Sequence, residues 1–490
     1  MKKKLVFIIF PVCLLLLAAG CKKMLEVAPQ SSITEASYFT SEGDFDPYVI
    51  GIYTQMRTLV NNVTYGMERG EELIQASNSR FTVAWSQVIT PSSGALDYNP
   101  WYKAIGNCNL LFDKIQSFPF ASSPDTKKRI LAETYSLRAY FYFSLTRIIG
   151  DAPLMLQAVV DENVPLLPRS PATDVVKQIN SDLDSAILLY QSMSNFSPSA
   201  YPSKYRFSYG STEALKADVA LWSAKVLGGG AADFNTAITA INNVEASGVS
   251  LNADFKNVVG LRAPANPEVI MSAYYQRDET GNNYAVNALP FLSIVQGALN
   301  LDSIPWCNSS SYGQGGYQIS TLSRALFDAF PGDKRIPYTW VTERDVSGPG
   351  VSWITKYPGT KYSDDRVPDN DVIMYRLADV YLMKAEAYAG LNQTDQAIPY
   401  LNLVRERAGN PDYSGATDEA SVEKEILDER GRELYFENKR WYDLVRFYKG
   451  GTIDIYNYIP NLIGKTTPIY WPLNTTVLGN NSMLVQTAGY

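Results

Sequence analysis

Two stretches of this sequence align with each other, and they restrict the folds open to the chain. Residues 211–247 and 372–408 each show an alanine-rich helix, a short turn and a second amphipathic helix. The aligned pairs are Leu221 with Leu382, Ala224 with Ala385, Ala237 with Ala397, Ile241 with Leu401 and Val244 with Val404. Small alanines let antiparallel helices approach closely, as in tetratricopeptide repeats of about 34 residues. The pattern therefore predicts a mainly α-helical scaffold of stacked helix pairs.

Helical periodicity continues on both sides of these repeats. A first helix is expected to begin near Ser41, and others are predicted over 101–115, 125–149 and 421–438. The helix over 125–149 is the longest and carries a wide apolar face. It ends at Gly150, which is a usual stop signal.

The chain between the two repeats has a different character. Residues 249–370 are rich in Gly, Pro, Asn, Ser and aromatic residues, and helix-length periodicity occurs only near 320–330. Long irregular segments are uncommon in compact proteins and tend to carry function. We therefore predict one body over residues 36–490, with a helical scaffold at 36–248 and 371–448 that carries a loop-rich, aromatic insertion.

The first residues are typical of an export signal. Three lysines precede an apolar run from Leu5 to Leu17 and the small residues Ala18-Ala19-Gly20. This run is too short for a transmembrane helix, which needs about 20 residues. The next residue is Cys21, and the order resembles the lipobox of bacterial lipoproteins, in which the cysteine is diacylated. We predict a signal peptide over residues 1–20, a lipid on Cys21 and a tether over residues 21–35.

Composition excludes several kinds of chemistry. The chain has no histidine, which removes His-based catalytic triads, Cys-His dyads and His-containing zinc sites. Its formal net charge is −7 without a basic block, so nucleic acid is not expected as a partner. Cys108 and Cys307 would remain in the mature chain; they could pair, but we expect two isolated buried thiols. No metal site and no cofactor are predicted.

Several motifs resemble those of the SusD/RagB-like family of Gram-negative cell-surface lipoproteins. The segments that carry the resemblance are Cys21–Val27 with Pro29, Trp101–Ile105 with Asn107 and Asn109, Ala132–Tyr142 followed by Gly150–Pro153, Tyr375–Leu382 with Ala385–Ala387, Glu429–Leu434 and Arg440–Arg446. Each segment is a weak signal alone. Their order along nearly the whole mature chain makes the resemblance specific.

This resemblance implies a body of about four tetratricopeptide-type helix pairs with an irregular ligand-binding half packed on it. It also implies a lipid-anchored place on the outer membrane, facing outward. The implied partner is a SusC-like TonB-dependent transporter, over which such proteins act as a hinged lid. The implied ligand is an oligosaccharide or, in some members, a peptide. Composition does not show any of these properties.

Candidate ligand contacts follow from the chemistry of sugars. A sugar ring presents an apolar C–H face, so glycan sites stack it on aromatic rings and fix its hydroxyls with amide or charged groups. Among 8 Trp and 33 Tyr, we expect the tryptophans in helical patterns and in the closing segment to be buried. These are Trp101, Trp222, Trp441 and Trp471. The candidate ring contacts are Trp306, Trp85, Trp340, Tyr312, Tyr317 and Tyr284, and the candidate hydrogen-bonding groups are Asn78, Arg80 and Glu72.

Other interpretations stay open. The acidic clusters at 364–365 and 369–371 could be glycosidase acids or a calcium site, although hydrated loops are the simpler interpretation. A retaining pair must stand about 5 Å apart, which sequence spacing does not show. Alternating charges at 429–433 are expected to form structural ion pairs. We predict a binding protein rather than an enzyme; the alternatives are a surface peptide binder of the same family, a carboxylate-dependent surface glycosidase and a structural adaptor.

Overall fold

The structure is a computed structural model that describes residues 38–75, 82–121, 123–159, 165–199, 203–309, 311–344 and 350–490. The predicted signal peptide, Cys21 and the predicted tether lie outside these residues. The chain divides into two compact units, Met1–Phe45 and Asp46–Tyr490. In the first unit, the Asp44 carboxylate accepts hydrogen bonds from the N–H groups of Thr40 and Ser41 and caps the short helix η1 (Glu42–Asp44).

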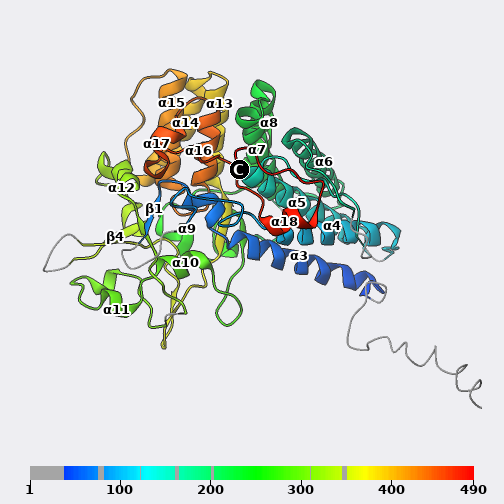
Figure 1. Ribbon diagram of the computed structural model, residues 1–490, viewed down its shortest axis with the longest axis horizontal. Helices are drawn as coiled ribbons and strands as arrows, with labels where there is room; N and C mark the ends of the chain where they lie inside the picture. Colours follow the sequence, from blue (N-terminus) through cyan, green and yellow to red (C-terminus); the bar gives the residue numbers. More distant parts are fainter. Residues whose placement is uncertain are drawn as a thin grey trace, which may run out of the picture. The chain divides into compact units, whose positions relative to one another are not determined.

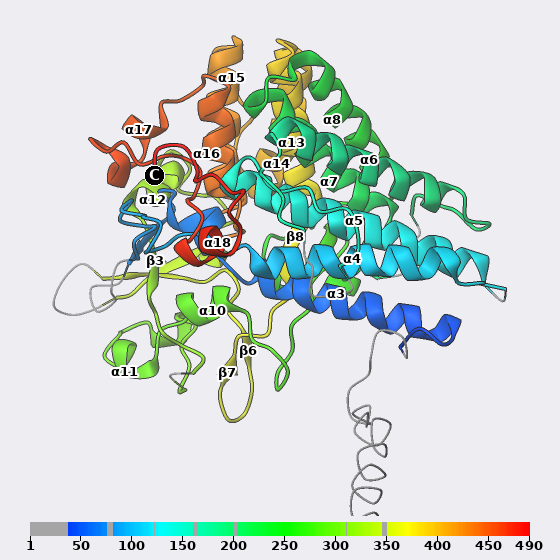
Figure 2. The same cartoon turned by 45° about the vertical axis from the view of Figure 1, so that its right-hand side comes forward.

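Helices dominate the described chain, as the sequence predicts. The scaffold helices are α3 (Phe45–Val60), α4 (Asn99–Ser117), α5 (Pro124–Ile149), α6 (Ala172–Gln191), α7 (Tyr209–Val226), α8 (Gly230–Glu245), α13 (Leu377–Gly390), α14 (Thr394–Ala408), α15 (Glu419–Glu433) and α16 (Arg440–Lys449). The pairs α5–α6, α7–α8 and α13–α14 pack most extensively, and α13 also lies against α8 and α15 (Figures 1 and 2). This succession of stacked pairs confirms the tetratricopeptide-like scaffold.

The second predicted repeat differs from the first at its start. Residues 372–376 form strand β8 (Val372–Arg376) instead of helix, because they pair with strand β2 (Val269–Ala273). The alanine stripe holds in both repeats: Ala224 and Ala385 are buried. Gly390 shows how close the repeats come, since a Cβ there would lie 2.3 Å from the Phe234 ring of α8.

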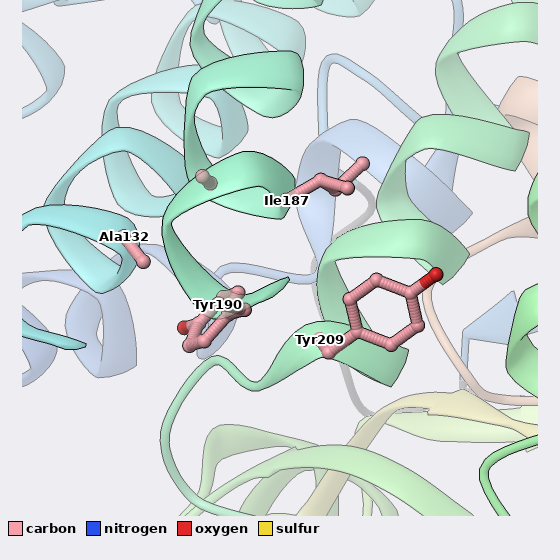
Figure 3. Packing of buried hydrophobic residues seen from close by; sticks show 5 residues of the cluster. Ala132, Ile187, Tyr190 and Tyr209 are labelled. Carbon is pink, nitrogen blue, oxygen red and sulfur yellow. The ribbon is translucent and has the colours of Figure 1, made fainter. Parts of the chain in front are cut away.

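Figure 3 shows how neighbouring helix pairs are joined. Ile187 and Tyr190 of α6 lie between Ala132 of α5 and Tyr209 of α7, and all four side chains are buried. The Tyr190 hydroxyl donates a hydrogen bond to the Phe207 carbonyl at 2.8 Å. The small Ala132 leaves room for the ring, and the hydrogen bond satisfies the buried hydroxyl.

The insertion is built from short helices and strands. Its helices are α9 (Lys256–Gly260), η3 (Ala263–Ala265), α10 (Asn283–Ala288), α11 (Leu292–Val295), η4 (Leu301–Ser303), α12 (Thr321–Asp328) and η5 (Ile336–Tyr338). Helix α12 confirms the helical segment predicted near 320–330. Besides β2, its strands are β3 (Tyr317–Ile319), β4 (Trp340–Thr342), β5 (Ser352–Ile354), β6 (Thr360–Lys361) and β7 (Arg366–Val367).

A four-stranded antiparallel sheet joins the insertion to a segment far earlier in the chain. Its order is β1-β3-β5-β4, in which β1 (Leu73–Gln75) pairs with β3 and Ile74 faces Gln318. In the next rungs, Gln318 faces Trp353, and Trp353 faces Val341. The remaining short helices are η2 (Thr64–Glu68), α17 (Ile455–Tyr458), η6 (Pro460–Leu462) and α18 (Thr475–Asn480).

A buried cluster of charges holds the insertion on the scaffold. Arg376 pairs with Glu268 at 2.8 Å, with Glu437 at 2.7 Å and with Glu433, and all of these side chains are fully buried. Arg335 of the insertion pairs with Glu433 at 2.9 Å and with a further glutamate of α15 at 2.6 Å. Burial opposes ionisation, but the surrounding arginines hold the pKa of Glu433 well below its usual range. The ion pairs predicted for 429–433 are therefore confirmed.

The last predicted helix ends earlier than its periodicity indicates. Helix α15 ends at Glu433 rather than near 438, because Phe436 and Asn438 take positive φ angles of 61° and 58°. This turn brings Glu437 to Arg376. Elsewhere, Cys108 and Cys307 are both buried and unpaired, as expected. Among the described residues, none of the helices combines the length and apolar character that crossing a membrane requires.

Candidate functional site

Trp306 lies in an open pocket of about 190 Å³ on the insertion. Its ring is partly buried and packs against the apolar cluster of Val295, Ile304 and Trp353. The other wall of the pocket is the β6–β7 hairpin, which extends away from the scaffold helices in Figure 2. The side chains that line this pocket, called the Trp306 pocket below, come from Asp302, Ile304, Trp306, Asn308, Lys361, Tyr362, Ser363, Asp364, Asp365 and Arg366.

Tyr362 supplies a second ring from the tip of the hairpin. Its N–H donates to the Asp365 carbonyl at 2.7 Å and closes the turn, and its hydroxyl donates to the Asp369 carboxylate at 2.6 Å. The hydrogen bond to Asp369 raises the pKa of Tyr362. The Arg277 guanidinium lies 4.5 Å from the ring centroid and pairs with Asp364. The ring is thus held in place on two sides.

Asp365 joins the two walls of the Trp306 pocket. Its carboxylate accepts hydrogen bonds from the N–H groups of Asn308 at 2.7 Å, Ser309 at 3.0 Å and Arg366 at 2.7 Å. In return, the Arg366 guanidinium donates to the Trp306 carbonyl at 3.2 Å. Because these bonds cross between the loop and the hairpin, both rings are positioned before any ligand arrives.

The chemistry of this pocket suits a sugar. Two partly buried rings can cover apolar C–H faces, and Asp302, Asn308 and Lys361 present exposed polar groups at the rim. Sequence reasoning missed Tyr362. The available signal was its position two residues before Asp364 in an irregular segment, where the acidic pair 364–365 was interpreted first as a hydrated loop and otherwise as glycosidase acids or a calcium site.

Trp85 and Tyr317 lie at a different place from Trp306. The Trp85 indole N–H donates to the Leu73 carbonyl at 2.9 Å, and its backbone N–H donates to the Thr82 hydroxyl at 3.0 Å. That hydroxyl donates to Glu68 at 2.9 Å, and Glu68 also accepts the Tyr317 hydroxyl. The network connects the Trp85 turn to strand β3.

Glu68 and Tyr317 line a second pocket, of about 400 Å³, which is almost entirely polar. Its walls carry Thr58, Asn61, Asn62, Val63, Thr64, Asn283 and Asn287 besides Glu68 and Tyr317. Amide and hydroxyl groups are the donors and acceptors that sugar hydroxyls use. Asn61 is already occupied, since its side chain donates to the Gly281 carbonyl and accepts from the Asn283 N–H. The pocket therefore offers hydrogen bonds but no free aromatic platform.

The remaining candidates occupy other surroundings. Glu72 is only 2% exposed, and burial raises the pKa of its carboxyl to about 8, so a surface ligand does not reach it in this conformation. Tyr284, named above as a candidate ring contact, belongs to α10 and is 1% exposed, so its ring does not reach the surface in this conformation. Trp340 is partly buried in β4, edge-to-face with Phe327. Tyr312 is partly buried in a turn. Asn78 and Arg80 lie outside the described residues.

The acidic clusters are engaged in structural contacts. Asp369 accepts Tyr362, and Asp371 pairs with Arg262 at 2.6 Å while accepting the Ala263 N–H at 2.9 Å. No group of three or more Cys, Asp or Glu side chains arranged to hold a metal ion occurs in the part of the chain that the structure describes. Trp101, Trp222, Trp353, Trp441 and Trp471 are all buried.

Two family models match opposite ends of the chain. The model described as "SusD family" matches residues 342–490, and the model described as "Starch-binding associating with outer membrane" matches residues 23–207. Together they include most of the predicted tether, helices α4 and α5, the Trp85 turn and the second repeat, and the N-terminal match begins two residues after Cys21. The β6–β7 hairpin also lies within the first model's range.

Curated relatives and solved structures are also similar to this chain, two of the three described next over nearly its full length. The SusD-like protein P38 of Formosa agariphila is 27% identical over 515 residues, which cover 96% of each chain. The starch-binding protein SusD of Bacteroides thetaiotaomicron is 30% identical over 146 residues, or 27% of this chain and 24% of that protein. The solved structure of B. fragilis NanU has a TM-score of 0.79 at 27% identity and covers 95% of this chain and 100% of its own.

Proposed function

Because this chain belongs to the SusD/RagB-like family, we propose that it captures a nutrient glycan at the surface of the outer membrane. The family model at its N-terminal part describes starch-binding proteins that associate with the outer membrane, and one relative is itself a starch-binding protein. The observation that carries the proposal is the Trp306 pocket, in which two fixed rings face exposed polar side chains. This is the arrangement that sugar recognition requires.

The mode of binding follows from the pocket's construction. A sugar ring stacks its C–H face on Trp306, and Tyr362 covers its edge. The side chains of Asp302, Asn308 and Lys361 take up hydroxyl groups, which distinguish one sugar from another. Since Asp365 already fixes both walls, little ordering free energy is lost on binding.

Passage of the glycan to a transporter is the second part of the proposal. A lipid on Cys21 with the tether over 21–35 would hold the body close to the membrane, within reach of a SusC-like TonB-dependent transporter. A Cys21→Ser chain is then expected in the soluble fraction of cells instead of the membrane fraction. Copurification of the wild-type chain with a TonB-dependent barrel from detergent extracts tests the partnership; its absence after mild cross-linking would count against it.

Retention on polysaccharide affinity gels tests the binding site. Wild-type protein is expected to be retarded by at least one glycan of a neutral and acidic panel, with Trp306→Ala weakening that affinity by about 30-fold. A Leu188→Ala variant is the control, because Leu188 is 65% exposed on the outer face of α6. Unchanged retention of Trp306→Ala would move the site elsewhere.

The same purified wild-type and variant proteins distinguish glycan binding from peptide binding and from hydrolysis. Retention by none of the glycans, together with binding of a mixed peptide library, would replace the glycan with a peptide. If the wild-type protein released sugar products from a polysaccharide and the Asp365→Asn variant did not, the protein would be a hydrolase instead of a binding protein. The engaged carboxylates of Asp365, Asp369 and Asp371 favour binding.

A further inference from the structure

A further pocket, of about 440 Å³, lies against helix α3. It is formed by the outer face of α3, the segment 203–206 and the end of β2 with the loop that follows. Ligand sites commonly measure about 300–1,000 Å³ and combine apolar lining with a few polar groups. This cavity, called the α3 pocket below, has no lining residue in common with the Trp306 pocket.

The floor of the α3 pocket is apolar. Tyr53 and Met56 of α3 and Ala273 of β2 are all buried and line it from below. Ile50 also lines the pocket and is 50% exposed, so its aliphatic side chain is accessible to a ligand. A hydroxyl group pressed against this floor would lose its hydrogen bonds to water without replacement, whereas a methyl group would not.

One wall is a corner of two tyrosine rings. The centroids of Tyr205 and Tyr274 lie 5.0 Å apart at an interplanar angle of 67°, and both rings are partly buried. The Tyr205 hydroxyl donates to Asp371 at 2.8 Å, so this ring cannot rotate freely. A fixed aromatic corner of this kind offers a face to the C–H groups of a sugar ring.

Part of the lining is charged. Arg57 and Glu279 form an ion pair at 2.6 Å, and the Glu279 side chain remains 40% exposed. Arg206 also lines the pocket, although its guanidinium is engaged by Asp46 at 2.7 Å and Glu133 at 2.8 Å. The Glu279 carboxylate therefore retains an accessible oxygen for hydroxyl groups, and its position is set by Arg57.

We infer that the α3 pocket binds a sugar residue that carries a methyl group, as 6-deoxy sugars and N-acetylated sugars do. The methyl group lies on the floor of Met56 and Ala273, the ring face lies on Tyr274, and ring hydroxyls bond to Glu279. This inference goes beyond the proposed function, because it assigns a separate site with its own preference. A branched glycan could occupy both pockets through different residues of one chain, which would raise its overall affinity.

Saturation-transfer NMR on the full chain in detergent tests the preference for a methyl-bearing sugar by comparing matched pairs of sugars. The methyl glycosides of L-fucose and L-galactose differ only at the 6-position, and those of N-acetylglucosamine and glucose differ only in the acetamido group. We expect at least about fivefold tighter binding of the methyl-bearing member in one or both pairs, since one buried methyl group changes affinity about tenfold or more. The pair that shows the difference in affinity identifies the preferred substituent, either the 6-deoxy methyl group or the acetamido group.

Variants locate the binding. Thr54 is exposed on α3 and lines the pocket, so Thr54→Trp fills it without disturbing the core and should abolish the preference for the methyl-bearing sugar. Thr239→Trp on the exposed face of α8 is the matched control and should keep the wild-type preference. Trp306→Ala should also leave this preference unchanged. Equal affinities within both pairs, a preference that survives Thr54→Trp, or a preference that disappears with Trp306→Ala would each overturn the inference.

Discussion

The scaffold and the insertion satisfy their buried polar groups by different means. In the scaffold, helices satisfy the backbone internally, and alanines such as Ala224 and Ala385 let the helices approach one another. In the insertion, side chains satisfy many of the backbone groups. The Asn370 side chain accepts a hydrogen bond from the Gly359 N–H at 2.6 Å, and the Asp365 carboxylate accepts hydrogen bonds from the N–H groups of Asn308, Ser309 and Arg366. The scaffold is therefore periodic and closely packed, whereas the insertion is irregular and leaves a pocket between its loop and its hairpin.

The charge cluster around Arg376 is where the two regions depend on each other, and its removal should have the largest effect. Arg376→Met removes from the buried carboxylates of Glu268, Glu433 and Glu437 the one cation that pairs with all three, which should lower the free energy of unfolding by about 3–5 kcal/mol. Urea denaturation measures the loss. Lys216→Met removes a surface pair with Asp184 and should change little. A loss as small as the control's would show that the regions are joined by packing alone.

Acid should weaken the same charge cluster around Arg376, which joins the scaffold to the insertion. The pKa values of Glu433 and Glu437 are lowered in the folded state because neighbouring cations outweigh burial. Their stabilisation is present above the unfolded pKa of about 4.5 and is lost as pH falls below it. Hydrogen exchange should therefore show β2 and β5 opening first between about pH 4.5 and pH 3. Opening of α7 before these strands would contradict a junction held by charge.

Glu72, which directly precedes strand β1, gives an effect of opposite sign. Burial raises the pKa of its carboxyl to about 8, so folding favours its protonated form. The loss of folding free energy caused by ionising this buried carboxyl is absent below about pH 4.5. It grows as pH rises and is complete above pH 8. Glu72→Gln should raise stability by about 1–3 kcal/mol at pH 9 and change little at pH 4. Glu71→Gln, which loses its pair with Arg440, should destabilise at both pH 7 and pH 9.

Close packing of the scaffold predicts a fourth, smaller effect. Gly390→Ala places a Cβ 2.3 Å from the Phe234 ring and should lower stability by about 1–3 kcal/mol, because overpacking forces the helices apart. Gly106→Ala in α4 meets no atom within 4 Å and should raise stability by about 1 kcal/mol through helix propensity. Thermal unfolding of both variants tests this. Equal shifts would mean that the repeats are packed loosely.

The smallest effect on stability is expected in the insertion, where it should appear as lost affinity. Asp365→Ala removes three hydrogen bonds to backbone N–H groups and should lower stability by only about 1 kcal/mol. Glycan affinity should fall about tenfold, because Trp306 and Tyr362 are no longer held together. Asp364→Ala, at the neighbouring exposed ion pair, is the control for stability. Full affinity in Asp365→Ala would show that the pocket does not depend on this link.

The sequence was sufficient for the scaffold because helix formation depends on neighbours three and four residues away. It placed α5 within one residue at its start and located both helix pairs of the repeat. It was wrong where a distant partner decides the outcome. The segment 372–376 has a helical pattern but pairs with β2, and the helix expected to reach 438 stops at Glu433 so that Glu437 can meet Arg376.

The candidate site was predicted only in outline. Trp306 lines a pocket, but Tyr362, which lines the same pocket from a hairpin more than fifty residues later, had only its position near an acidic pair as a local signal. Strands of two or three residues, such as β6 and β1, are too short for an alternating pattern to be recognised. Exposure was also undetermined by local pattern, since Tyr284 is buried and Trp306 is not.

By itself, the sequence determined the helical scaffold, the exclusion of histidine chemistry and the family resemblance, all of which are properties of residues close together in the chain or of composition. The lipid anchor on Cys21 stays a prediction of the same local kind. The tertiary structure decided which aromatic side chains reach solvent and which are brought together. The Trp306 pocket depends on the hydrogen bond from the Asn308 N–H to the Asp365 carboxylate, and the α3 pocket depends on the contact between the Tyr205 and Tyr274 rings. Such juxtapositions depend on long-range packing, which no local pattern encodes.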